Sequence, residues 1–449
     1  MKKFIQTIQN IWNIEELRMK ILITLGFIAI YRFGSFLVLP GIDPVVIDLI
    51  NSSNSGGGGL FGLINQFSGG AFMNASIFAL GIMPYISASI AMQLLTLAVP
   101  AFQKMQKEGE SGRRQINQIT RILTIAVTLV QGIGYVAYLN GTYGDAITIG
   151  SPVLFSVSTI VILTAGTLFV MWLGERITDK GLGNGISLLI MVGIIANLPS
   201  AILQEFGYRG QTGGIIIFII EMAVLILVVI GTILLVQGTR RIPVQYAKRN
   251  IVKGGRMMQA GGVRQYLPIK VNAAGVMPII FAQALMFLPS TVVSVFQIQG
   301  GFWNNLADPF NIWNGVMSFF LVVLFTYFYT ALTINPIQIA DDLKKNGGFI
   351  PGVKPGRKTA EFIDNVVSRI TLPGSIFLGI VAILPIIARQ ADIQPAFALF
   401  YGGTSLLILV AVVLDTLQQI ESYLLMRQYD GLTKAGRIKG RQGSIGAGI

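Results

Sequence analysis

The octapeptides GIMPYISA (residues 81–88) and GVMPIIFA (residues 275–282) share five of their eight residues. Each lies near the start of the second apolar span in one of two halves of five spans. Internal repeats of this kind are typical of membrane proteins whose pathway lies between two related halves. Chance is the alternative explanation, because Gly and Pro are both common in membrane helices.

The composition is that of a membrane protein that crosses the bilayer many times. Of 449 residues, 53% are hydrophobic and 12% are charged, and the mean hydropathy is +0.68. In a soluble globular chain roughly a quarter of the residues are charged. The chain has neither Cys nor His, which excludes disulfides and a Ser-His-Asp triad. We therefore expect no catalytic residues, no metal and no cofactor.

Ten apolar runs are long enough to cross a hydrocarbon layer of about 30 Å as helices. We therefore predict an all-α polytopic membrane protein with ten transmembrane helices. The runs lie at residues 21–39, 75–98, 119–139, 153–173, 186–204, 214–236, 274–296, 313–333, 371–388 and 401–421.

The positive charges predict the orientation of these spans. Of the 33 Lys and Arg residues, 30 fall in the N-terminal segment, in the loops after spans 2, 4, 6 and 8, or in the C-terminal tail. Because Lys and Arg are enriched in cytoplasmic loops, both termini are expected in the cytoplasm. The other three are Arg32 inside span 1, Arg209 in an outer loop and Arg389 at the outer end of span 9.

An odd number of spans in each half predicts that the second half is inverted relative to the first. Pro84 and Pro278 are expected to bend their helices, and bent helices facing each other would enclose an hourglass-shaped cavity. The predicted divisions are a cytoplasmic amphipathic segment (1–20), two halves (21–205 and 206–421) and a basic cytoplasmic tail (422–449).

Residues 56–70, GGGGLFGLINQFSGG, contain a short apolar stretch bracketed by glycines. A helix of eight residues is about 12 Å long and cannot span a bilayer. Lipid does not tolerate the irregular backbone on either side of it, so the segment belongs in a protein-lined cavity or at a surface. A mobile stopper for a pore and a simple re-entrant or interfacial loop explain the residues equally well.

Two basic loops are longer than the turns needed to join helices. One contains RRIPVQYAKR (240–249), and the other runs from NPIQIADDLKK to GVKPGRKTAEFID (335–364). Their length favours a docking surface for a polyanion such as ribosomal RNA, or for an acidic protein face. The alternative is that they only set the orientation and attract anionic lipid.

Few ionisable residues lie deep in the spans. The clearest are Arg32 and Glu221, with Asp415 and Glu421 toward the cytoplasmic end of span 10. Such residues are functional candidates because their insertion is costly. A structural ion pair or a side chain reaching the interface is the favoured interpretation for all except Glu221, which stays open. This scarcity of charge, with no phosphate-binding GxxxxGK[ST] loop, argues against a small-solute secondary transporter and against ATP-driven work.

Isoleucine is abundant where the repeat predicts a constriction. Ile82 and Ile86 are one helical turn apart, as are Ile186 and Ile190, and Ile280 follows the second proline of the repeat. A collar of β-branched side chains is stiff and can seal a pore by dewetting. Ordinary helix packing is the alternative for any one of these residues.

Further long motifs cover nearly the whole chain. They are FSGGAFMNASIFALGIMPYISASI (67–90), KEGESGRRQINQITR (107–121), MWLGERITDKGLGNGIS (171–187), RRIPVQYAKR (240–249), NPIQIADDLKKNGGFIPGVKPG (335–356) and FYGGTSLLI (400–408). With them the chain resembles the SecY family of bacterial protein-conducting channels.

The resemblance implies a channel, not an enzyme, that passes unfolded polypeptides across the bacterial cytoplasmic membrane. The expected fold is a clamshell of two inverted halves, with a hinge between helices 5 and 6, a central pore and a short plug helix. Transmembrane segments are expected to leave sideways into lipid through a gate between helices 2/3 and 7/8.

The resemblance also implies roles for individual residues. The pore ring would be Ile82, Ile86, Ile186, Ile190, Ile280 and Ile408. The plug would be residues 57–70, with Leu60, Phe61, Leu63, Ile64 and Phe67. The lateral gate would carry Ser87, Gln131 and Gln283.

The expected partners follow from the same resemblance. They are the small subunits SecE and SecG, the SecA motor, the ribosome through its RNA, YidC and SecDF, presecretory and nascent membrane proteins, and anionic lipids. Ribosome and motor would dock on loops 238–271 and 334–370, through Arg240, Arg241, Lys248, Arg249, Arg256, Lys354 and Arg357.

One position departs from the family pattern. The second docking loop has Lys354 in GVKPG, where the family usually has Arg. Lysine keeps the charge but lacks the bidentate fork of arginine. Arg357 is therefore expected to share the contact with the motor.

Overall fold

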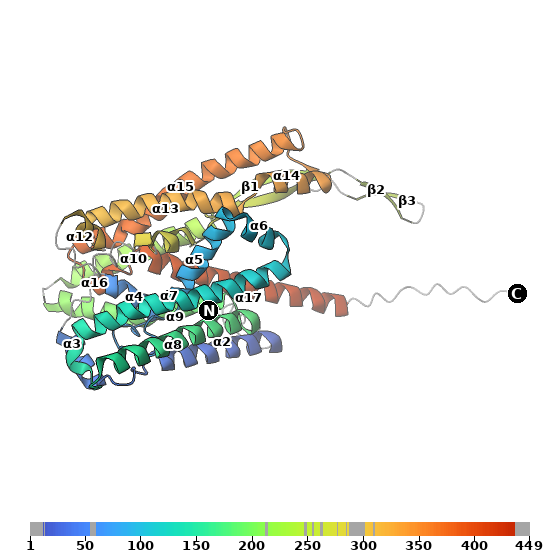
Figure 1. Cartoon of the computed structure of the whole chain (residues 1–449). Helices are drawn as coiled ribbons and strands as arrows, with labels where there is room; N and C mark the ends of the chain where they lie inside the picture. The colour runs from blue at the N-terminus through green and yellow to red at the C-terminus, as the bar shows by residue number, and fades with distance from the viewer. Residues whose placement is uncertain are drawn as a thin grey trace.

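Figure 1 shows the computed structural model of the chain. It describes residues 12, 14–53, 60–211, 214–246, 249–253, 256–260, 264–275, 277–283, 285–286, 301–308 and 310–435. The long helices run side by side along one direction. Helices α3, α12 and α16 lie at one end of this bundle, and α6, α14 and the strands lie at the other.

The long helices account for most of the predicted spans. They are α2 (Glu15–Gly34), α5 (Met83–Ala98), α7 (Glu110–Thr142), α8 (Pro152–Lys180), α9 (Gly185–Gln211), α10 (Ile215–Gln237), α13 (Ile312–Thr333), α15 (Arg357–Gln390) and α17 (Gly403–Ala435). Within the described ranges, seven helices are long and apolar enough to cross a membrane. An eighth span results if α5 and α6, which meet at 101°, count as one. Most of the predicted span 274–296 lies outside the described residues.

Shorter helices connect and flank the spans. They are α3 (Pro44–Ser53), α4 (Leu60–Ser68), α6 (Pro100–Lys107), η1 (Gly144–Ala146), α12 (Phe302–Ala307), α14 (Pro336–Lys345) and α16 (Pro395–Ala398). Several begin with proline, whose missing N–H costs nothing in the first turn of a helix.

The two copies of the repeat adopt the same local backbone. Gly81 has φ +53° and Gly275 has φ +66°, a left-handed conformation that favours glycine. In the first copy α5 begins two residues after the glycine, so Pro84 lies in its first turn, and in the second copy residues 277–283 are helical. The prediction that Pro84 bends its helix is wrong, because a proline in the first turn disturbs no intrahelical hydrogen bond. For Pro278 it stays a prediction. The shared turn supports a true internal repeat.

Helix α9 is the centre of the packing. It contacts α2, α4 and α8, which belong to the predicted first half (21–205), and α10, α16 and α17, which belong to the predicted second half (206–421). Within the second half α13 packs on α15, and α15 packs on α17. The main hydrophobic core therefore lies where α9 meets α17, between the two halves.

The prediction of an all-α chain is wrong in the basic loops. Strands β1 (Thr239–Tyr246), β4 (Arg264–Lys270) and β5 (Gly348–Phe349) form an antiparallel sheet in the order β4-β1-β5. Strands β2 (Arg249–Lys253) and β3 (Arg256–Ala260) form a hairpin.

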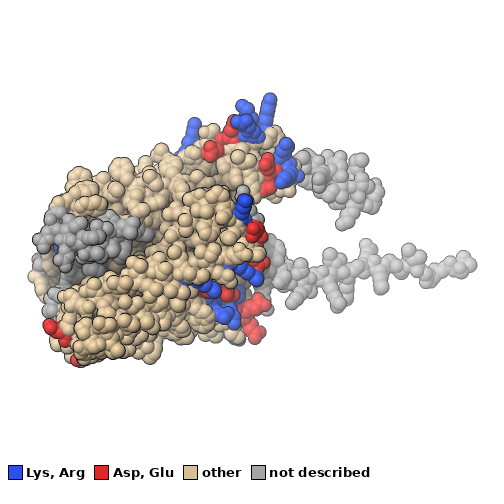
Figure 2. Space-filling model, in the orientation of Figure 1, with Lys and Arg blue, Asp and Glu red and all other residues tan. Residues whose placement is uncertain are grey.

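This sheet forms because alternate residues of β1 are apolar. Ile242 and Val244 point to the same face and are buried against Leu343 of α14 and Ile363 of α15. The two basic loops, far apart in the sequence, thus share one small core. Figure 2 shows Lys and Arg gathered at this end of the molecule, over α6, α14 and the start of α15, whereas the middle is almost free of charge.

Candidate pore, plug and gate

The six isoleucines expected to form the pore ring lie in one apolar cluster. Ile82, Ile190 and Ile408 are among its buried residues, at 5%, 4% and 2% exposure, and Ile86, Ile186 and Ile280 pack against them. They come from the start of α5, the first turns of α9, residues 277–283 and the first turns of α17. The structure therefore brings together every residue of the predicted ring, although its role as a pore constriction stays a prediction.

The short helix α4 packs on α9 beside this cluster. Phe67 of α4 belongs to the same apolar cluster, and Ile64 belongs to the core of the first half. A helix of nine residues, roughly 14 Å long, is too short to cross the bilayer. Its contacts with α9 place it inside the protein and not at an exposed surface. Residues 57–59 and the side chains of Leu60, Phe61 and Leu63 lie outside the described part of the chain.

The residues expected at the lateral gate do not bond to one another. Ser87 on α5, Gln131 on α7 and Gln283 are each partly buried, and no hydrogen bond joins any two of these three. Another pair bridges the halves instead: the hydroxyl of Tyr329 on α13 donates to Oε1 of Gln93 on α5.

An aromatic contact continues this bridge. The ring of Tyr329 lies 5.3 Å from that of Phe281, which in turn lies 5.5 Å from Phe325 on α13. Segment 277–283 is thereby packed on α13 beside the bond to α5. Sequence reasoning missed Gln93 and Tyr329, although a glutamine in the apolar stretch 88–98 was a signal that a partner had to exist.

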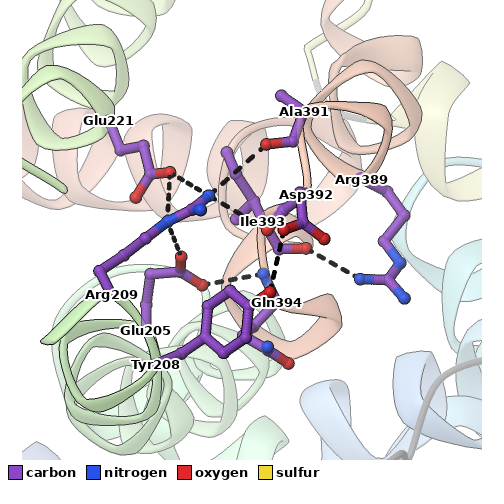
Figure 3. Close-up of polar contacts among 9 residues, drawn as sticks. All are labelled: Glu205, Tyr208, Arg209, Glu221, Arg389, Ala391, Asp392, Ile393 and Gln394. Carbon is purple, nitrogen blue, oxygen red and sulfur yellow. Dashed lines mark hydrogen bonds and ion pairs between the residues drawn. The ribbon is translucent and has the colours of Figure 1, made fainter. Parts of the chain in front are cut away.

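A buried ionic cluster joins α9 to α10 at another place, shown in Figure 3. Nη2 of Arg209 lies 2.7 Å from Oε1 of Glu221 on α10, and its Nε lies 3.0 Å from Oε1 of Glu205 on α9. All three side chains are at most 7% exposed. The expectation of Arg209 in an outer loop is wrong: α9 continues to Gln211, which places Arg209 in its last turn. Glu221, left open by the sequence, is the ion-pair partner.

The same cluster holds a third element, the turn between α15 and α16. Nη2 of Arg209 donates to the carbonyl oxygen of Asp392 at 3.1 Å, and the backbone N–H of Gln394 donates to Glu205 at 2.8 Å. The hydroxyl of Tyr208 donates to the carboxylate of Asp392 at 2.9 Å (Figure 3). Helices α9 and α10 and the α15–α16 turn are therefore fixed to one another.

The other intramembrane candidates have simpler surroundings. Asp415 accepts a hydrogen bond from Gln419 one turn later on α17, at 3.4 Å. Glu421 is exposed, as is Asp415, so neither is a buried charge. Gln419 also accepts from the backbone N–H of Gly183 at 2.9 Å, which ties α17 to the loop between α8 and α9.

The predicted docking residues lie on or beside the sheet. Arg240 and Arg241 are exposed on β1, and Lys354 and Arg357 are exposed in and just after the turn that precedes α15. Arg357 pairs with Glu361 at 3.4 Å. Arg249 and Arg256 belong to β2 and β3, whereas Lys248 is outside the described residues. A shallow hollow beside them is lined by Pro243, Val244, Gln245, Tyr266 and Pro351.

Comparison with known proteins shows which family has this architecture. The family model described as SecY matches residues 76–417. The protein translocase subunit SecY of Streptomyces scabiei is 44% identical over 430 residues, covering 93% of this chain and 97% of that protein.

Solved structures with the same fold are more distant in sequence. A SecY structure, described as one whose plug domain stabilises the closed state of the translocation channel and maintains a membrane seal, has a TM-score of 0.60 at 17% identity. The alignment covers 94% of this chain and 95% of that one. Sec61 in a canine ribosome-channel complex has a TM-score of 0.56 at 18% identity, over the same shares of the two chains.

Proposed function

Because this chain belongs to the SecY family, we infer that it forms the channel through which unfolded polypeptides cross a membrane. The observation that carries this conclusion is the position of the apolar cluster. Six isoleucines from both halves meet beside a short helix that cannot itself span the bilayer. The chain is a channel subunit and not an enzyme, so its function is to open and close a pore for polypeptides.

The chemistry of the cluster suits this task. A ring of isoleucines offers no fixed charge or hydrogen-bond donor, so a small hydrated ion gains nothing by entering it. A polypeptide fills the ring with its own side chains and can be accommodated as the helices move apart. Helix α4, whose Phe67 packs into the same cluster, is the plug of the resting channel.

The contacts between the halves suggest how the channel opens. One neutral hydrogen bond, between Gln93 and Tyr329, links α5 to α13, whereas Arg209 links α9 to α10 and to a third element through charged contacts. Bonds to charged groups are stronger than neutral ones, so the α5–α13 side is the one that separates. Docking and an apolar signal helix then favour the open over the closed arrangement.

We assign the ten predicted spans to a clamshell of two inverted halves, 21–205 and 206–421. With α5 and α6 taken as one, eight spans are counted above, and we assign the other two to α2 and to the predicted span 274–296. Gathering of Lys and Arg at the end with the sheet supports a cytoplasmic location of that end and of both termini, in the inner membrane of a bacterium.

The sheet supports the proposal that the basic loops are a docking surface. The sheet joins the two basic loops through one shared hydrophobic core. Loops that served only to set the orientation of the chain in the membrane would not need such a core. The ribosome and the SecA motor are the proposed partners there, and the Sec61 relative forms a complex with a ribosome. SecE, SecG, YidC, SecDF and anionic lipids complete the proposed set of partners.

Cross-linking to a stalled nascent chain tests the proposed function. The chain has no cysteine, so Ile82→Cys or Ile280→Cys provides a single reactive thiol. We expect either to cross-link to a polypeptide arrested in transit, whereas Leu227→Cys, on the exposed face of α10, does not. Equal cross-linking at residue 227, or none at residues 82 and 280, would contradict a path through this cluster.

A further inference from the structure

Arg32 is a charged residue on α2 that has no acidic partner among the described residues. It lies in the last turn of α2, and none of the five ion pairs formed by described residues includes it. The expected structural ion pair is therefore not what holds this side chain. A guanidinium in an apolar region needs some compensating contact, because its insertion is costly.

The compensating contact is the backbone at the end of the plug helix. Nη1 of Arg32 donates to the carbonyl oxygen of Gly69 at 2.7 Å, directly after the last residue of α4. The last carbonyl groups of a helix have no partner within it and carry the negative end of its dipole. A cation there satisfies a carbonyl and balances the dipole together. The neighbouring Tyr31 hydroxyl points to the carbonyl of Ser68 at 3.5 Å.

The carboxyl end of α4 packs so closely against α2 and α9 that no side chain fits at Gly69 or Gly193. Gly69 has φ +66°, and a Cβ added to it would lie 2.9 Å from Cα of Gly193 on α9 and 2.7 Å from Nη1 of Arg32. A Cβ on Gly193 would lie 2.4 Å from the carbonyl oxygen of Phe67. The amide of Asn197 on α9 also donates to the carbonyl of Asn65, at 3.3 Å. The backbone of residues 65–69 is thus held between α2 and α9.

We propose that Arg32 is the positioning residue that latches the carboxyl end of the plug helix in the closed channel. This inference rests on the proposed function, because it assigns a role to the plug of that channel. Loss of the charge leaves the terminal carbonyl without its strongest partner and frees the helix to leave its seat. The direct consequence is a channel that leaks at rest.

The test measures resting ion leak. The full-length chain, with the small subunits that purify with it, is reconstituted in phospholipid vesicles, and chloride efflux is followed without any motor or substrate. Arg32→Met should raise the leak about tenfold, the factor expected for losing a bond to a charged group. Arg32→Lys, which keeps a charged donor, should stay close to the unmodified channel.

Arg389→Met is the matched control. Arg389 also lies in the last turn of a helix and donates to a backbone carbonyl, that of Ile393 at 3.2 Å, but no hydrogen bond or ion pair joins it to the described residues of α4. Its leak should equal that of the unmodified channel. If Arg32→Met does not accumulate in the membrane, Arg32→Gln takes its place. A neutral variant at residue 32 that seals as well as the unmodified channel overturns the proposal, as does an equal leak from Arg389→Met.

A second measurement separates a latch from a general loss of stability. With a motor and nucleotide present, Arg32→Met should increase translocation of a preprotein whose signal sequence has been shortened. A chain that is merely less stable would translocate every client less well, and that result also overturns the latch. Failure of the unmodified channel to translocate any preprotein would instead refute the proposed function and leave the leak comparison standing.

Discussion

The guanidinium of Arg209 lies 2.7 Å from the carboxylate of Glu221, and this contact joins the last turn of α9 to α10. Glu205 and the backbone of Asp392 complete the surroundings of the guanidinium. Two carboxylates thus share one arginine at a position where all three are buried. The cluster joins α9, α10 and the α15–α16 turn, none of which takes part in the bond between Gln93 and Tyr329.

Removing the arginine should destabilise the protein strongly. Arg209→Met leaves two buried carboxylates without a counter-charge, and breaking a buried pair in this way costs about 3–5 kcal/mol. Denaturant unfolding in detergent measures the loss. Arg114→Met is the control, because Arg114 pairs with Glu110 on the surface, with both side chains about four-fifths exposed, and should have little effect. A small effect of Arg209→Met would mean that the carboxylates find other partners.

Covalent cross-links should distinguish the contacts around Arg209, which we expect to stay closed, from the α5–α13 contact, which we expect to open. Tyr208→Cys with Asp392→Cys places two thiols beside the ionic cluster, and Gln93→Cys with Tyr329→Cys places two across the gate. A short bifunctional maleimide should block translocation only in the pair at residues 93 and 329, because we propose that only the α5–α13 side opens. Preprotein protection from protease measures transport before and after cross-linking. Blockage by the link at residues 208 and 392 would show that the cluster itself comes apart.

The gate bond should set how apolar a signal sequence must be. Tyr329→Phe removes the hydroxyl that binds Gln93, and a neutral hydrogen bond contributes about 1 kcal/mol, or roughly a fivefold change in the open population. We expect weak signal sequences to be translocated severalfold better, and strong ones as before. Tyr327→Phe, on an exposed position of the same helix, is the control. Unchanged discrimination in Tyr329→Phe would exclude this bond from gating.

Reversing the charge of Lys354 should weaken motor-driven transport. The side chain is exposed in the turn before α15, so Lys354→Glu should change docking without changing the fold. Post-translational translocation of a presecretory protein, measured across a range of salt concentrations, is the readout, because exposed charges are screened by salt. Lys104→Glu, exposed on α6, serves as the matched control. Normal transport by Lys354→Glu would remove this residue from the docking surface.

Local sequence patterns predicted the apolar helices well. Runs of apolar residues indicated α7, α8, α9, α10, α13, α15 and α17, because a membrane segment must satisfy its backbone bonds within itself. The sequence shows the glycines of the repeat but not the left-handed turn that they form, and so it does not show that Pro84 lies in the first turn of α5. The strands were missed because loops of high positive charge hid a short alternation in β1, seen at Ile242 and Val244.

The sequence by itself determined that this chain belongs to the SecY family of membrane channels, and it indicated most of the membrane helices. The pore ring that it proposed stays a prediction, on six isoleucines that belong to one apolar cluster. Only the tertiary structure decided which residues hold the halves and the plug in place. Gln93 and Tyr329 are 236 positions apart, and Arg32 and Gly69 are 37 apart. Hydropathy indicates which segments enter the membrane. The contacts between side chains depend instead on the rotation and depth of each helix relative to its neighbours, and these are determined by the packing of the whole chain.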